Sequence, residues 1–192
     1  YHPPIIPETT GIVIGCICIT GIIFGLIAFM FSSLLHLTKK SSSRFIKGLP
    51  YRLCIGGCFV LALSFIIGDT RYLGLGLPVI SASMVEPVLW YDGIMKMVFT
   101  LLTIGFCFKG GEVTPLFFIG STLGNTLSVW IPLPMSLMAA MGFCAVFSSA
   151  SKSPIACSIM GMEIFGIESL PFIALANAAA SLSSGKKGIY TQ

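Results

Sequence analysis

Apolar residues occur along this chain in runs that are separated by polar, glycine-rich or proline-containing breaks. The first run covers residues 11–37. It exceeds the roughly 20 residues that a helix needs to cross a bilayer, so we predict a long, tilted helix. The second run covers residues 53–67, and we expect it to return across the membrane.

The pattern changes after residue 68, where the breaks become frequent. Gly74-Leu75-Gly76-Leu77-Pro78 and then Glu86-Pro87 interrupt the next apolar stretch. The later runs cover residues 93–108, 116–130, 135–147, 154–165 and 170–182. Most are shorter than the roughly 18 residues of a full span. Short, interrupted segments of this kind are typical of transporters whose binding site lies near the middle of the bilayer.

Composition supports the membrane interpretation. Hydrophobic residues make up 55% of the chain and charged residues 9%, and the mean hydropathy is +0.97. A soluble protein carries about 25% charged residues, so these values indicate an all-α, multi-pass membrane protein in contact with the lipid bilayer. The net charge of +4 does not indicate a nucleic-acid partner, because the basic residues lie in connecting segments without interleaved aromatic residues.

A cluster of basic residues lies between the first two runs. It consists of Lys39, Lys40, Arg44, Lys47 and Arg52. Lysine and arginine are enriched in cytoplasmic loops of membrane proteins. We therefore expect the segment 39–52 to be a cytoplasmic loop.

The sequence does not indicate catalytic, metal or cofactor chemistry. Its seven cysteines lie mostly in apolar runs and form no C-x-x-C pair, and His2 and His36 are isolated. Free cysteine commonly packs as a small apolar residue. We therefore expect no enzyme activity, no metal and no cofactor. The chain begins with Tyr1 and has no basic n-region, so we expect no signal peptide. A fragment and a natural half protein both remain open.

The most informative break covers residues 109–115. Gly110 and Gly111 permit open backbone geometry, and Pro115 suits the first turn of a helix over residues 116–130. The first amides of a helix have no partner within it and lie at the positive end of its dipole. Apolar runs flank this break, so the sequence predicts an anion site at membrane depth, where irregular backbone requires protein or water around it.

The same segment carries a family resemblance. Gly111-Glu112-Val113-Thr114-Pro115 resembles the third anion-filter loop of the CLC chloride channel and transporter family, commonly Gly-x-Phe-x-Pro. Three further stretches agree with the family in order and spacing. They are Gly74-Leu75-Gly76-Leu77-Pro78, then Ser153-Pro154-Ile155 leading to Met162-Glu163, and Gly185-Lys186-Lys187-Gly188-Ile189-Tyr190.

The resemblance implies that residues 1–192 are the C-terminal half of a CLC transmembrane domain. That half is the second of two inverted repeats and combines long tilted helices with short, broken or re-entrant ones. The first repeat, with its gating glutamate and filter serine, would be absent, and the last helix would be truncated. The resemblance also implies a homodimeric full-length protein in the cell membrane, most simply a bacterial plasma membrane. Small residues over 170–182 suit either internal packing or a subunit interface.

By the same resemblance, the anion-binding residues are Gly111, Glu112, Val113 and Thr114, which offer backbone amides, and Tyr190, which offers its phenol O–H. Weak binding at several donors is what ion conduction requires. An alternative for Tyr190 is an aromatic residue at the membrane interface.

The filter loop departs from the common chloride pattern, which has Phe where Val113 stands. Glu112-Val113-Thr114 is similar to the fluoride/proton antiporter branch. An ionised Glu112 would repel an anion, so it must be protonated, turned away or paired, and it is our candidate for proton coupling. Stabilisation of the helix N-terminus is its alternative role. Chloride transport, by a channel or a chloride/proton exchanger, and a non-transporting fragment or subunit remain open as functions.

Four other ionisable residues lie near or within apolar runs. Glu163 is expected to be a structural acid, with Lys152 as a possible partner. Lys96 and Lys109 border apolar segments, and we expect them to extend toward the membrane surface.

Overall fold

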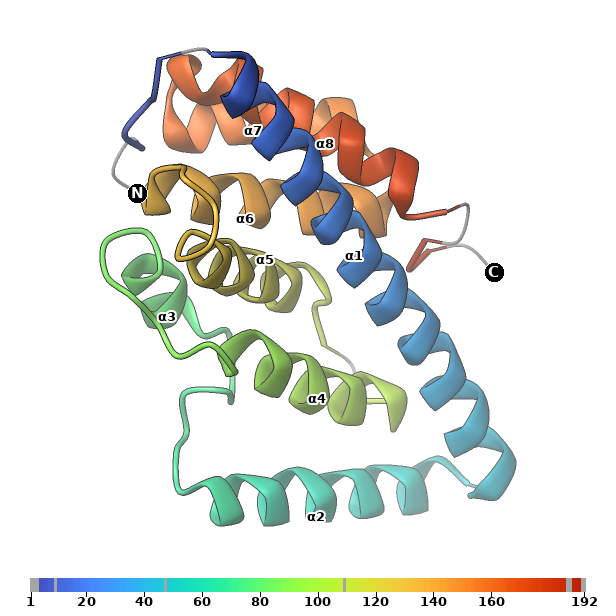
Figure 1. The fold of residues 1–192 in the computed structure, drawn as a ribbon. Coiled ribbons are helices and arrows are strands. Elements are labelled where there is room, and N and C mark those ends of the chain that lie inside the picture. Colours follow the sequence, from blue (N-terminus) through green and yellow to red (C-terminus); the bar gives the residue numbers. More distant parts are fainter. Residues whose placement is uncertain (1–3, 9, 47, 109, 186–187, 191–192) are drawn as a thin grey trace.

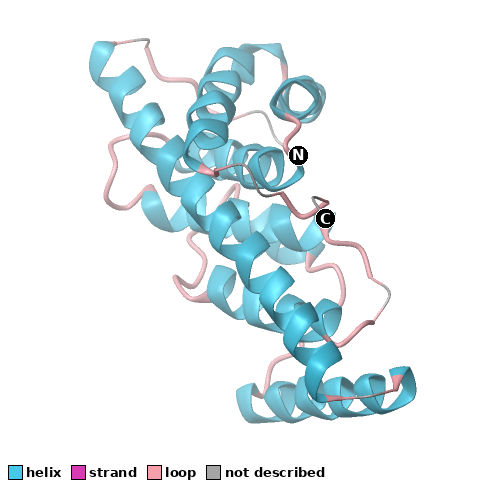
Figure 2. Ribbon diagram, turned by 90° about the vertical axis from the view of Figure 1, so that its right-hand side faces the viewer, coloured by secondary structure: helices cyan, strands magenta, loops and turns pink. Residues whose placement is uncertain are grey.

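The computed structural model describes residues 4–8, 10–46, 48–108, 110–185 and 188–190. Within these ranges the regular structure is helical (Figures 1 and 2). The helices are α1 (Gly11–Phe45), α2 (Leu49–Ile67), α3 (Leu77–Ala82), α4 (Asp92–Gly105), α5 (Val113–Leu127), α6 (Met135–Ser151), α7 (Pro154–Phe165), the 3-10 turn η1 (Ile167–Ser169) and α8 (Leu170–Ser183).

Helix α1 is longer than the sequence predicted. It continues to Phe45, so Lys39, Lys40 and Arg44 belong to its last turns, and only residues 46–48 separate it from α2. The expected loop over 39–52 is therefore wrong as secondary structure. No glycine or proline occurs between Gly25 and Gly48 to end the helix, and cations are favourable near a helix C-terminus.

Only α1 and α2 are long and apolar enough to cross a membrane by themselves, among the helices described. Helix α1 runs the length of the molecule and lies across α8 and α6 at one end and α4 at the other (Figure 1). Helix α2 lies apart from the centre, with Gly56 as its one buried residue. The predicted combination of long and short helices is confirmed.

The centre is built from close contacts between helix backbones. A Cβ placed on Gly142 of α6 would collide with the backbone of Gly120 in α5. A Cβ on Gly21 of α1 would lie 2.7 Å from the Ala179 Cβ of α8. Small residues let membrane helices approach in this way. One face of the alanine-rich α8 thus packs within the molecule, against α1.

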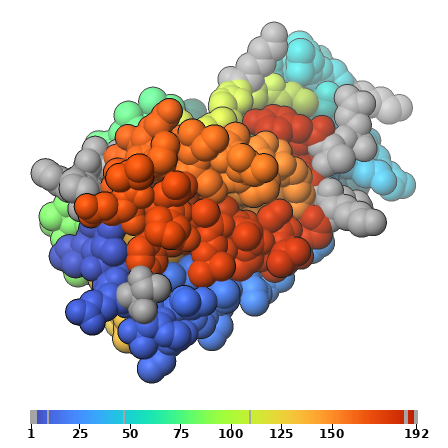
Figure 3. Space-filling model, turned by 90° about the horizontal axis from the view of Figure 1, so that it is seen from above, coloured from blue at the N-terminus to red at the C-terminus, as the bar shows by residue number. Residues whose placement is uncertain are grey.

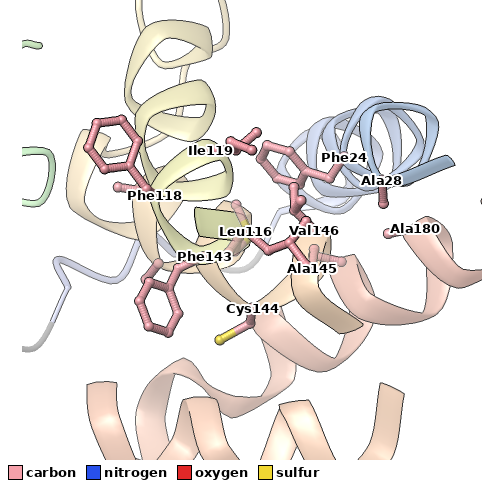
Figure 4. Close-up of a cluster of buried hydrophobic side chains, with 14 of the residues drawn as sticks. Phe24, Ala28, Leu116, Phe118, Ile119, Phe143, Cys144, Ala145, Val146 and Ala180 are labelled. Carbon is pink, nitrogen blue, oxygen red and sulfur yellow. The ribbon is translucent and has the colours of Figure 1, made fainter. Parts of the chain in front are cut away.

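Larger side chains fill the space between these contacts. Figure 4 shows Phe24 and Ala28 of α1 near side chains of α5, α6 and α8. The Phe117 and Phe143 rings stack with centroids 3.9 Å apart, which joins α5 to α6. Leu116, Phe118 and Val146 are fully buried. The core therefore lies at the α5–α6 crossing and extends to α1 and α8.

A buried asparagine holds the irregular segment between α3 and α4. The Asn125 side-chain N–H group donates to Ser83 O at 2.7 Å and Glu86 O at 2.9 Å, and its Oδ1 accepts from Val88 N at 3.2 Å. These bonds satisfy backbone groups at the predicted Glu86-Pro87 break. Non-helical backbone at membrane depth requires such partners.

Candidate functional site

The predicted anion site lies at the N-terminus of α5. This helix begins at Val113, three residues before the predicted start, and Pro115 is its third residue. Proline lacks an N–H that the first turn would leave unpaired in any case, so the helix begins before it without losing a bond. Gly110 and Gly111 are exposed, and residues 112–114 are partly exposed. The start of this helix is thus not buried within the chain.

Glu112 precedes the helix as its N-cap residue, and its side chain makes no capping hydrogen bond. Its Oε1 lies 3.1 Å from Nζ of Lys39, in the last part of α1. The Glu112 side chain is 13% exposed and the Lys39 side chain 41%. Of the three states that the sequence allowed for Glu112, the structure contains the paired one.

The segment that ends at Tyr190 lies against α1 and α6. Gly188 O accepts a hydrogen bond from His36 Nε2 at 3.1 Å, and Ile189 N donates to Ala150 O at 2.9 Å. The Tyr190 side chain is exposed. His36 and Lys39 are three residues apart, so they lie on one face of α1. A single turn of α1 therefore contacts both predicted parts of the anion site.

Lys152 binds the end of α8, just before this segment. Its Nζ donates to Ser184 O at 3.1 Å, to Ser184 Oγ at 2.8 Å and to Gly185 O at 2.6 Å. It is therefore not the partner of Glu163, which lies exposed on α7. The pairing was suggested by closeness in sequence, but Lys152 has left-handed backbone geometry at the end of α6 and reaches the end of α8 instead.

Lys96 does not extend to the surface as expected. It is 1% exposed, in the middle of α4, and its Nζ donates to Tyr72 O at 2.9 Å and Gly74 O at 2.7 Å. The Phe118 ring centroid lies 5.2 Å from Nζ. Its position inside an apolar run was the signal that sequence reasoning undervalued, since a charge within such a run is commonly functional. Lys109 lies outside the described residues.

A polar network that the sequence did not predict joins the loop after α2 to the start of α4. Asp92 is fully buried and accepts from Tyr72 Oη at 2.6 Å, Arg71 Nη1 at 3.4 Å and Leu89 N at 3.2 Å. Burial of Tyr72, and next its hydrogen bond to Asp92, raise the pKa of its phenol. The network fixes the loop whose carbonyls hold Lys96.

In the ranges that the structure describes, no group of three or more His, Cys, Asp or Glu side chains is arranged to hold a metal ion. The residues of the candidate site provide backbone amides, hydroxyl groups, the Lys39–Glu112 ion pair and the buried Lys96.

A family match, similar sequences and a similar solved structure all relate this chain to chloride channels and their relatives. The family described as "Voltage gated chloride channel" matches residues 8–185. A "Chloride/fluoride channel protein" of Pseudomonas syringae pv. tomato is 42% identical over 176 residues, which are 88% of this chain and 39% of that protein. The "Voltage-gated ClC-type chloride channel ClcB" of Salmonella typhimurium is 27% identical over 177 residues, 86% of this chain and 42% of that protein.

The fold agrees with these sequence matches. The crystal structure of a CLC-type fluoride/proton antiporter superposes with a TM-score of 0.93 at 36% identity, over 98% of this chain and 49% of that chain. The chain thus spans about half the length, or less, of these relatives. Because the family match covers all of the described helices and the fold agrees with a member's structure, the chain belongs to the voltage-gated chloride channel (CLC) family.

Proposed function

We propose that this chain is the second half of the transmembrane domain of a CLC-type fluoride/proton antiporter and that it supplies half of the anion pathway. The proposal draws on a fluoride/proton antiporter structure at 36% identity and a relative whose name includes fluoride at 42% identity. The coverage of 49% of the antiporter chain fits one of two inverted repeats. The role is transport rather than catalysis.

In this proposal the anion is held by neutral donors. The backbone amides of Glu112, Val113 and Thr114 meet it at the start of α5, and the phenol O–H of Tyr190 reaches it from the segment bound to α1. Helix N-terminal amides and the dipole favour an anion there. Because these donors are neutral, they bind the anion without trapping it.

The Lys39–Glu112 ion pair, 3.1 Å long, carries the proton-coupling part of the proposal. While Glu112 is ionised, Lys39 offsets its charge and holds it beside α1, which limits repulsion of the anion. Protonation of Glu112 removes the attraction to Lys39, so the side chain becomes free to turn toward the anion and donate its O–H. One carboxyl group thereby links the arrival of a proton to the state of the filter.

The test uses the full-length parent protein in liposomes, with fluoride and chloride efflux measured side by side. We expect faster fluoride efflux, accompanied by proton movement in the opposite direction. Thr114→Ala removes a hydroxyl donor in the filter and should reduce discrimination against chloride. Equal rates for the two halides in the unaltered protein would contradict the fluoride assignment and leave chloride transport, as named for the Salmonella relative, as the function.

The full-length protein is proposed to be a homodimer in a bacterial plasma membrane, with α7 and α8 at the subunit interface. These two helices form the broad orange and red surface in Figure 3. A shallow apolar groove of about 560 Å³ lies between them, and Ile155 and Leu182 beside it are 79% and 88% exposed. Cross-linking of cysteines placed at these two positions tests the interface, and a monomer with full activity would contradict it.

The cytoplasmic orientation of segment 39–52 is retained as part of the proposal. Ser43 is exposed and Ser42 is buried in the last turns of α1, so Ser43 is the better reporter. In a cysteine-free full-length protein, Ser43→Cys should resist an impermeant thiol reagent applied outside intact cells and react after the cells are opened. Labelling in intact cells would reverse the orientation.

A further inference from the structure

Lys96 is a buried lysine whose charge is not balanced by a carboxylate among the described residues. Its side chain is 1% exposed in α4, and the ion pairs described are Lys39–Glu112, Arg71–Asp69 and Arg71–Asp92. A buried charge is costly unless it is paired and hydrogen-bonded. An anion bound next to Lys96 would therefore stabilise its buried charge.

The ammonium group is held in a fixed position. Its contacts with Tyr72 O and Gly74 O, at 2.9 and 2.7 Å, use two of its three N–H groups. A Cβ on Gly76, which has φ +72°, would lie 2.6 Å from the Phe118 ring and 3.5 Å from Nζ. Glycine at this position thus lets the loop approach Lys96 closely, and one N–H remains for a ligand.

This lysine lines a cavity of about 240 Å³ that reaches the candidate filter. Other lining residues are Tyr72 and Gly74 on one side, and Gly110, Gly111 and Pro115 on the other. The volume far exceeds the roughly 30 Å³ share of one water. It therefore accommodates a halide together with part of its hydration shell, directly before the turn that contains Glu112.

The hydroxyl groups in the cavity wall do not compete with Lys96 as donors. Thr100 Oγ1 donates to Lys96 O at 2.7 Å, and Thr103 Oγ1 donates to Phe99 O at 2.8 Å. Their hydrogen atoms are committed to the α4 backbone, so these hydroxyl groups are not free to donate to an anion. Among the described residues that line the cavity, Lys96 is therefore the cationic donor.

We propose that this cavity is a holding site for a small hydrated anion, attracted by Lys96 before it reaches the amides at the start of α5. The proposal rests on the proposed halide transport. A fixed charge in a low-dielectric wall raises the local concentration of the opposite charge. The two carbonyl groups share the ammonium, so the anion is held weakly and can be passed on.

The first test compares Lys96→Met with Lys96→Arg in the full-length protein in liposomes. Loss of the charge should raise the KM for fluoride efflux about tenfold, within the range expected for electrostatic focusing, while the maximal rate changes less than about twofold. Lys96→Arg should retain the KM. Lys40→Met is the matched control, because Lys40 is exposed on α1. An unchanged KM in a folded Lys96→Met protein would overturn the proposal.

The second test needs no variant and therefore does not depend on folding. Crystals of the unaltered full-length protein are soaked in bromide, whose anomalous scattering identifies its position. We expect a bromide peak between Nζ of Lys96 and Gly111. Bromide bound elsewhere, with no peak in this cavity, would overturn the holding site. If the protein carries no halide yet binds bromide here, the proposed function fails while the site stands.

Discussion

The centre of the molecule and helix α2 differ in what holds them. In the centre, α5 and α6 touch through Gly120 and Gly142, and α1 meets α8 through Gly21. In α2, Phe65 is 87% exposed and Leu61 69%. Both regions are apolar, but among the described residues of α2 only Gly56 is buried, while Val60 and Leu63 are half-buried against the core. Close contacts between helix backbones therefore hold the helices around the candidate site in place. The exposed side chains of α2 are instead free to contact lipid or another part of the protein.

The largest expected effect is from Gly142→Ala in the full-length protein. The added methyl would collide with the backbone of Gly120, which no side-chain movement relieves, so we expect loss of the folded protein, measured as loss of a single peak in gel filtration. Gly15→Ala is the control, because nothing lies within 4 Å of a Cβ there, and alanine favours helix by about 1 kcal/mol. A folded, active Gly142→Ala protein would show that α5 and α6 can separate enough to admit a methyl group.

The next effect is expected from Asn125→Leu. The change leaves Ser83 O, Glu86 O and Val88 N without their side-chain partner, and an unpaired buried group costs about 1–3 kcal/mol. We expect a clear fall in thermal unfolding temperature in detergent. Thr126→Val is the control, since its hydroxyl donates to Thr122 O within its own helix. Equal unfolding temperatures for the two variants would contradict the role given to Asn125.

A smaller effect on stability, but a specific one on transport, is expected from Lys39→Met. Lys39 is 41% exposed, and exposed ion pairs contribute only about 0–1 kcal/mol, so the protein should fold normally. Its proton-to-fluoride ratio, measured in liposomes, should fall because Glu112 loses its partner. Glu112→Gln should give the same loss, and Lys40→Met should not. An unaltered proton-to-fluoride ratio in Lys39→Met would show that the ion pair plays no part in proton coupling.

The smallest effect is expected from Phe65→Ala on α2. A surface substitution of this kind changes stability by about 0.5 kcal/mol or less, whereas Phe31→Ala, at a fully buried position in α1, should cost about 3–5 kcal/mol. Thermal unfolding in detergent measures both. If the two variants lost similar stability, α2 would have a packing partner that its exposure in this chain does not reveal.

The sequence predicted the helices where a residue fixes their ends. Helix α7 begins at Pro154 and ends before Gly166, as predicted, because proline suits a first turn and Gly166 has φ +94°. The end of α1 was missed, since Lys39 and Arg44 indicate membrane topology but do not break a helix. Family resemblance supplied the candidate site residues, and their binding roles remain predictions.

Contacts between distant segments were beyond the reach of sequence reasoning. The Lys39–Glu112 pair joins residues 73 positions apart, and no local pattern specifies it. The same is true of Lys96, whose two carbonyl partners belong to a glycine-containing loop more than 20 residues earlier. Apolar periodicity reports which face of a helix is buried, but not which loop covers it.

The length of α1 gives the candidate site a mechanical property. Its 35 residues, at 1.5 Å each, make a rod of roughly 52 Å, and a change in tilt of about 5° would displace one end by about 4–5 Å relative to the other. Since helix tilt adjusts to bilayer thickness, the rod that bears His36 and Lys39 would transmit thickness to both parts of the filter at once. Fluoride turnover measured across lipids of increasing acyl-chain length should therefore pass through an optimum, and a flat response would show that the rod is clamped by its neighbours.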